Sequence, residues 1–154
     1  KPPITVEVTD VMREISVMLV NNNPLLAQLL SRFFHLEGRA RVTVANSHDE
    51  DVLTVAGLVD PEAVLIELAT AGEQDLEMIR RLREILPECL IVATSDTIEP
   101  RELVTAAGAD SLVLKTDVNL KFLVSVHTWV RRNRQRARTI RPIQTSYRRA
   151  PQAN

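Results

Sequence analysis

The sequence contains few of the residues that build several common kinds of functional site. It has one cysteine, Cys89, which excludes an intrachain disulfide and a cysteine zinc site. Its four glycines argue against a glycine-rich nucleotide-binding loop. No Ser/His/Asp grouping or metal-ligand cluster stands out, so we expect no enzymatic activity, no cofactor, no bound metal and no small-molecule substrate.

Long hydrophobic runs are also missing. No apolar stretch is long enough to cross a bilayer, and no charged-then-apolar leader resembles a signal peptide. These absences favour a cytoplasmic protein without a membrane partner.

The composition is that of a globular protein with an uneven charge distribution. The 154 residues are 45% apolar and 25% charged, which suits one domain with a core. Residues 131–154 carry eight arginines and no acidic residue, which leaves 11 basic and 20 acidic residues in 1–130. The body therefore has a net charge of −9 and the tail of +8, which suggests an acidic domain with a basic arm.

Five short apolar runs alternate with segments of helical spacing. The runs are 15–20, 41–45, 63–68, 90–94 and 111–115. Strands that are apolar throughout are buried on both faces, and parallel strands need right-handed crossovers. The order therefore predicts an α/β fold, a flavodoxin-like doubly wound sheet of five parallel strands, (βα)5, followed by an extended C-terminal helix and a basic tail.

Boundary signals divide the chain into three parts. We expect a leader over 1–14 with an alternating stretch typical of an edge strand, a domain over 15–131, and a basic arm or linker over 132–154. The sequence predicts a helix that begins at Pro24 and a second that follows the capping-box pattern at 47–50. Further helices are predicted over 76–86 and 100–107, and the long last helix begins near Asp117.

Polar residues follow four of the predicted strands. They are Asn21 and Asn22, Glu67, Thr94 and Ser95, and Lys115. Functional sites in such sheets gather at the carboxyl ends of the strands, so we expect these side chains to lie close together.

This set resembles the receiver domain of two-component response regulators over roughly 15–131. In "MLVNNNPLLAQLL", Asn21 and Asn22 stand where the family has a pair of aspartates, and the following Asn-Pro is similar to the NarL/FixJ subgroup. "PEAVLIEL" is similar to the segment that ends in the phosphoacceptor aspartate, and Glu67 occupies that position.

The later motifs agree with the resemblance. Thr94 stands at the switch threonine or serine, and Lys115 at the family's invariant lysine. Leu112 occupies the switch position at which many members have tyrosine or phenylalanine. The resemblance thus implies a CheY-like fold and a signalling role.

The substitutions at Asn21, Asn22 and Glu67 change the chemistry that the resemblance implies. A receiver accepts a phosphoryl group on aspartate with the help of Mg²⁺, which prefers charged oxygen ligands. Two of the three carboxylates are amides here, and Glu67 extends about 1.5 Å further than aspartate would. We therefore predict a pseudo-receiver that is not phosphorylated.

Two interpretations of this pocket follow. In the first, Glu67 pairs with Lys115, bonds Thr94 and accepts hydrogen bonds from the amides of Asn21 and Asn22, which holds an activated-like state. In the second, the pocket is inert and the same ion pair is ordinary.

The last helix offers a candidate partner face. The resemblance places the stripe of Phe122, Val126 and Trp129 against the sheet. The other stripe would then be partly exposed, and contiguous exposed apolar patches usually mark interfaces. The predicted partner face, for a homodimer or another protein, consists of Leu120, Leu123, Val124 and Val130.

The basic arm is expected to stay helical to about Arg138, before Pro142. Its leading arginines are Arg131, Arg132, Arg134, Arg136, Arg138 and Arg141. Docking on an acidic protein surface and a plain linker both fit this composition, and nucleic acid fits less well because only one aromatic residue accompanies the charge.

Two functions remain in competition. The first is a phosphorylation-independent interaction module that signals through its last helix and basic arm. The alternative is the receiver part of a transcription regulator whose DNA-binding domain is missing from this chain.

Overall fold

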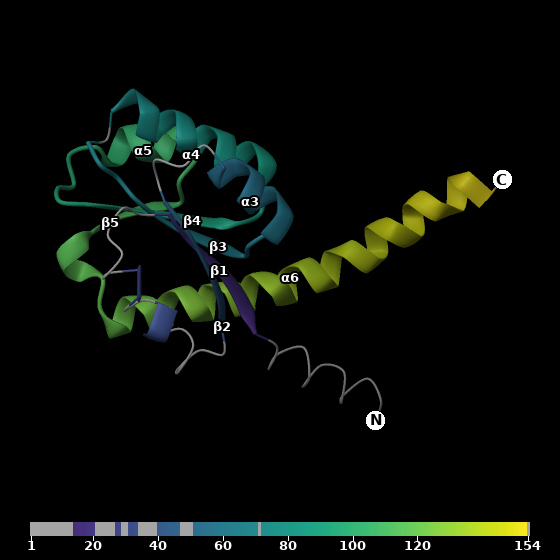
Figure 1. The fold of residues 1–154 in the computed structure, drawn as a ribbon. Helices are drawn as coiled ribbons and strands as arrows, with labels where there is room; N and C mark the ends of the chain where they lie inside the picture. Colours follow the sequence, from purple (N-terminus) through teal and green to yellow (C-terminus); the bar gives the residue numbers. More distant parts are fainter. Residues whose placement is uncertain are drawn as a thin grey trace.

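Five parallel strands form the centre of the molecule (Figure 1). The computed structural model describes residues 14–20, 27–28, 31–33, 40–46, 51–70 and 72–153, with side chains described as far as 136. The strands pair in the order β2-β1-β3-β4-β5. They are β1 (Ile15–Val20), β2 (Ala40–Ala45), β3 (Ala63–Glu67), β4 (Leu90–Ser95) and β5 (Ser111–Leu114). The order confirms the predicted doubly wound parallel sheet.

Helices cover both faces of this sheet. Figure 1 shows α3, α4 and α5 on one face and the long last helix, α6, on the other. They are α3 (Val52–Val59), α4 (Glu73–Ile85), α5 (Arg101–Ala107) and α6 (Leu120–Ala153), with a 3-10 helix at Lys115–Asp117. Of the helix predicted from Pro24, residues 27–28 and 31–33 are helical. The edge strand predicted in the leader and the capping box at 47–50 lie outside the described residues.

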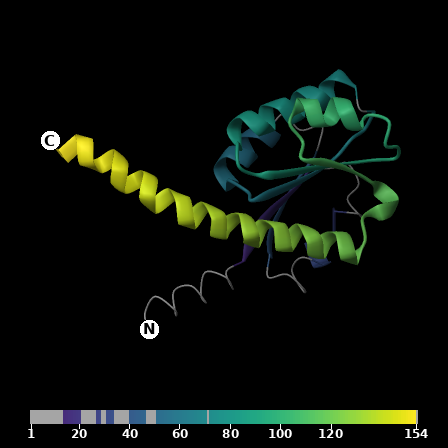
Figure 2. The ribbon, with the colours of Figure 1, turned by 180° about the vertical axis from the view of Figure 1, so that it is seen from behind.

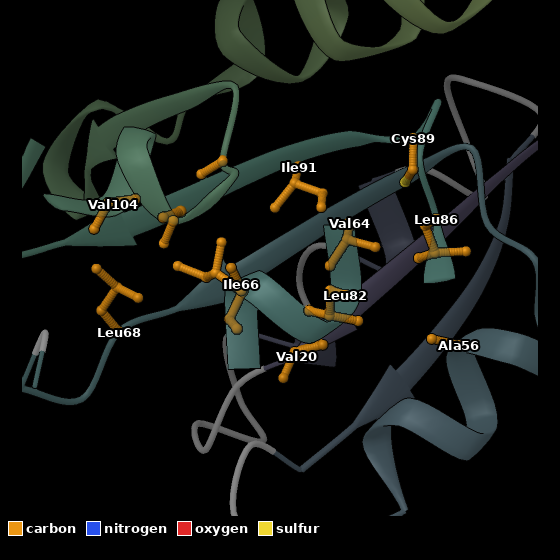
Figure 3. Close-up of a cluster of buried hydrophobic side chains, with 14 of the residues drawn as sticks. Val20, Ala56, Val64, Ile66, Leu68, Leu82, Leu86, Cys89, Ile91 and Val104 are labelled. Atoms are coloured by element: carbon orange, nitrogen blue, oxygen red, sulfur yellow. The ribbon is translucent and has the colours of Figure 1, made fainter. Parts of the chain in front are cut away.

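Two hydrophobic cores result from the alternation of side chains along each strand. In β1, Met18 and Val20 pack with residues of α3, α4 and α5, and Figure 3 shows this cluster around Val20, Val64 and Ile66. The alternate residues of β1 pack against α6 on the other face. The near-continuous apolar strands of the sequence are therefore explained by burial on both sides.

A hydrogen-bonded brace joins α4 to the start of β4 and the end of α5. The Arg83 guanidinium donates to the backbone carbonyl oxygens of Gly108 and Cys89, each at 2.8 Å, and pairs with Asp110 at 2.8 Å. Asp110 in turn accepts a hydrogen bond from the backbone N–H of Ile91. Gly108 has a φ of 128°, a conformation that favours glycine.

Helix α6 is longer than predicted. It begins at Leu120, where the side chain of Asn119 accepts a hydrogen bond from the backbone N–H of Phe122. It does not end near Arg138 but continues to Ala153, and its second half runs out beyond the sandwich in both views (Figures 1 and 2). Pro142 therefore lies inside the helix, although proline has no N–H to donate to the preceding turn. No helix among the described residues combines the length and apolarity needed to cross a membrane.

Candidate functional site

The strand register brings the predicted pocket residues to one edge of the sheet. Glu67 is the last residue of β3 and pairs with Thr94 of β4. Thr94 in turn pairs with Val113 of β5, and Lys115 follows β5 in the first position of the 3-10 helix. Because the strands are parallel, all of these residues lie at the same carboxyl edge.

An ion pair occupies this edge. The Lys115 Nζ lies 3.3 Å from Glu67 Oε2 and 3.6 Å from Asp96 Oδ1. The Glu67 side chain is 14% exposed, whereas Asp96 is 83% exposed. Solvent and salt therefore screen the contact with Glu67 less than the contact with Asp96. The predicted pairing of Glu67 with Lys115 is present.

The two predicted switch residues are both buried. Thr94 is buried, and its backbone carbonyl accepts a hydrogen bond from the N–H of Leu68, the residue after Glu67. Leu112 is buried in the core shared with α3, α4 and α5. A leucine there fills the core and has no polar group to turn toward solvent.

The amide pair lies outside the described residues. The hydrogen bonds expected from Asn21 and Asn22 to Glu67 therefore stay a prediction. The neighbouring register is known, because Val20, the last residue of β1, pairs with Ile66, the residue before Glu67.

Asp75, which was not among the predicted site residues, organises the loop that follows Glu67. Its Oδ2 accepts hydrogen bonds from the backbone N–H groups of Ala69 and Thr70, each at 3.1 Å. A carboxylate that accepts two backbone N–H groups makes charge-assisted bonds, which are the stronger kind. A sequence signal existed, since an acidic residue in the first turn of a helix is typical of N-terminal stabilisation.

The predicted partner face is half wrong. Leu123 and Val130 are 5% and 1% exposed and pack against β1, so they belong to the core. Leu120 and Val124 are 60% and 52% exposed, as predicted. Helix α6 is thus rotated about its axis relative to the expected orientation, because two overlapping apolar stripes made the buried face ambiguous.

Arg134 also differs from its predicted role in the basic arm. Its guanidinium binds both carboxylate oxygens of Glu62 and the backbone carbonyl of Glu14. Glu62 Oε1 additionally accepts a hydrogen bond from the N–H of Ser16 at 3.0 Å. We call this group the Arg134 latch; it fixes α6 to the amino edge of the sheet, beyond residue 131.

The other arginines of the arm fit the prediction as far as the structure describes them. Arg131, Arg132 and Arg136 are exposed. The side chains of Arg138 and Arg141 lie outside the described part. Within the described residues, no three His, Cys, Asp or Glu side chains are placed to hold a metal ion.

Comparison with known proteins gives two kinds of match. Residues 4–115 match the family model described as the TrkA-N domain. The chain is 27% identical over 126 residues to the DNA-binding response regulator MtrA of Mycolicibacterium smegmatis, covering 80% of this chain and 54% of that protein. It is 28% identical over 102 residues to the nitrate/nitrite response regulator NarL of Escherichia coli, covering 65% and 47%.

A solved receiver domain agrees with the matches to response regulators. The CheY-like receiver domain protein of Methanospirillum hungatei superimposes with a TM-score of 0.69 at 13% identity, covering 80% of this chain and 98% of that one. At this identity the likeness establishes the fold alone. The chain spans about half the length of the curated relatives it matches.

Proposed function

We propose that this chain, which belongs to the TrkA-N domain family by its match over residues 4–115 and has the CheY-like fold of response regulator receivers, is a phosphorylation-independent pseudo-receiver that acts by binding protein. The receiver part of this proposal is supported by the fold, by the response regulators among the curated relatives, and by Thr94 and Lys115 at the strand ends. Receiver domains are generally signalling modules without enzymatic activity.

The observation that carries the proposal is the Glu67–Lys115 ion pair. The carboxylate of Glu67 already stands within 3.3 Å of the lysine that would otherwise face a phosphoryl group. An ammonium at that distance also repels a cation from the only carboxylate among the three family positions. The residues present therefore do not fit Mg²⁺, which prefers charged oxygen ligands.

The surface through which the module would bind a partner lies at the start of α6. Leu120 and Val124 are one helical turn apart, so they form a single exposed apolar strip. Exposed apolar groups gathered in this way are typical of a protein contact.

A second candidate function is supported by the length comparison. The chain covers 54% of MtrA, whose name describes a DNA-binding response regulator. The chain would then be the receiver part of a transcription regulator, and α6 would lead toward a DNA-binding domain. A longer coding sequence that continues into a helix-turn-helix would favour this candidate.

Phosphoryl transfer from a small donor tests the main proposal. The full chain is incubated with acetyl phosphate and Mg²⁺, and its intact mass is measured by mass spectrometry. We expect no added phosphoryl group. The matched control is the triple variant Asn21→Asp, Asn22→Asp, Glu67→Asp, which restores the family's carboxylates beside the existing Thr94 and Lys115 and is expected to accept the group.

The opposite outcome is equally clear. A phosphoryl group that appears on the wild-type chain and disappears in Glu67→Gln would show that the pocket is chemically active, and the proposal would be wrong.

A further inference from the structure

Acidic side chains gather at the carboxyl edge of the sheet. Every loop that follows a strand emerges at this edge, because the strands are parallel. The exposed acidic residues in these loops and in the helix turns that follow are Asp51, Glu73, Asp96, Glu99, Glu102 and Asp117. The basic residues in the same regions are Arg101, Lys115 and Lys121, and Arg80 pairs with Glu73 at 2.9 Å. We call this surface the acidic edge; it keeps an excess of negative charge.

The basic arm leaves the molecule at the opposite edge. Helix α6 starts after β5 at the carboxyl edge and runs back along the sheet. At Arg134 it reaches Glu62 and Glu14, which directly precede β3 and β1. Everything beyond Arg134 therefore lies past the amino edge, and Figures 1 and 2 show the helix continuing away from the sandwich.

The two charged regions of one molecule cannot meet. The Arg134 side chain is 11% exposed and its guanidinium binds both oxygens of Glu62, so it holds the direction in which α6 leaves the sheet. The helix continues without interruption from Leu120 to Ala153, which leaves no turn through which the arm could fold back. A body of −9 and an arm of +8 are nevertheless almost equal and opposite.

We propose that the arginine arm of one molecule docks on the acidic edge of a second copy of this chain. The contact is head to tail, because the two surfaces lie at opposite edges of the sheet. Such a heterologous contact adds further copies unless it closes into a ring. The proposal deepens the function proposed above by naming a partner for the arm, and it places that partner beside the Glu67–Lys115 pair.

Sedimentation velocity of the full chain tests this contact. At about 0.05 M salt we expect association that grows with protein concentration. At about 1 M salt, where the Debye length falls to about 3 Å, we expect monomers. The arm variant Arg136→Gln, Arg138→Gln, Arg141→Gln and the edge variant Glu99→Gln, Glu102→Gln should each lose association about tenfold or more.

Mixing the two variants gives the sharpest outcome. The arm variant keeps its acidic edge and the edge variant keeps its arm, so the mixture should form a 1:1 complex that grows no further. The matched control for the edge variant is Asp60→Asn, Glu84→Gln, which removes the same charge at exposed positions away from the acidic edge. This control should associate as the wild type does.

Several outcomes would overturn the proposal. They are a wild type that stays monomeric at low salt, association that resists about 1 M salt, and equal losses in the control and edge variants. A monomeric chain whose arm instead binds a labelled DNA duplex would assign the arm to nucleic acid. Because none of these measurements uses a phosphoryl donor, each outcome leaves the pocket proposal to its own test.

Discussion

Replacing Arg134 with methionine removes the charge of the Arg134 latch but keeps most of the apolar stem. Glu62 then loses its partner at a site that is only partly open, since the Arg134 and Glu62 side chains are 11% and 26% exposed. Breaking a fully buried pair costs about 3–5 kcal/mol and a surface pair about 0–1 kcal/mol. The Arg134 latch lies between these limits, and Glu62 keeps its bond to the N–H of Ser16. We therefore expect a loss of about 2 kcal/mol in the free energy of unfolding.

Thermal and urea unfolding measure this loss. For a chain of this size, about 2 kcal/mol lowers Tm by about 6 °C. The fluorescence of Trp129, the only tryptophan, reports on α6 separately from the far-UV circular dichroism of the whole chain. The matched control is Arg132→Met, which sits on the same helix at an exposed position and should change stability by less than about 0.5 kcal/mol. Equal stability of the two variants would refute the anchoring role of Arg134.

Three further predictions concern the core and the turns. Leu123→Ala should lower the free energy of unfolding by about 2–4 kcal/mol in urea, whereas Leu120→Ala should lower it by less than about 0.5 kcal/mol. A larger loss for Leu120→Ala than for Leu123→Ala would support the orientation of α6 that the sequence suggested. Gly108→Ala should cost more than about 1 kcal/mol, because φ is positive and the added Cβ would lie 2.9 Å from Arg83 Cβ; an unchanged Tm would contradict this close approach. Burial raises the pKa of the Cys89 thiol from 9.0 to about 12, so the unfolded chain ionises first and the free energy of unfolding should fall as pH rises from 9 toward 12. A Cys89→Ala variant should lack that part of the pH dependence, and rapid modification of the native thiol at pH 8 would show that the residue is not buried.

The strands and their order could be predicted from the sequence because their signal is local. Each strand is a short apolar run, and β1 has the predicted bounds, Ile15–Val20. The position of the pocket residues could be predicted from the same apolar runs, since residues at the end of a buried parallel strand lie at the carboxyl edge of the sheet. That rule placed Glu67 and Lys115 together before any distance was known.

The orientation and length of α6 could not be predicted in the same way. Leu120, Leu123 and Val124 fall within an arc of about 100° around the helix axis, so the sequence did not decide which of them faces the sheet. The partner of Arg134 is 72 residues away in the chain, and no local pattern announces such a pair. The prediction of a helix end near Arg138 rested on Pro142, but the helix continues through this proline.

The central claim is that the signalling surface does not respond to phosphorylation. Hydrogen exchange of the full chain, with and without acetyl phosphate and Mg²⁺, tests it most directly. We predict identical exchange in β4, α5, β5 and the first turns of α6 for the wild type, and altered exchange there for the variant that restores three aspartates at positions 21, 22 and 67. A change in the wild type that Glu67→Gln abolishes would contradict the claim and show a working phosphoacceptor.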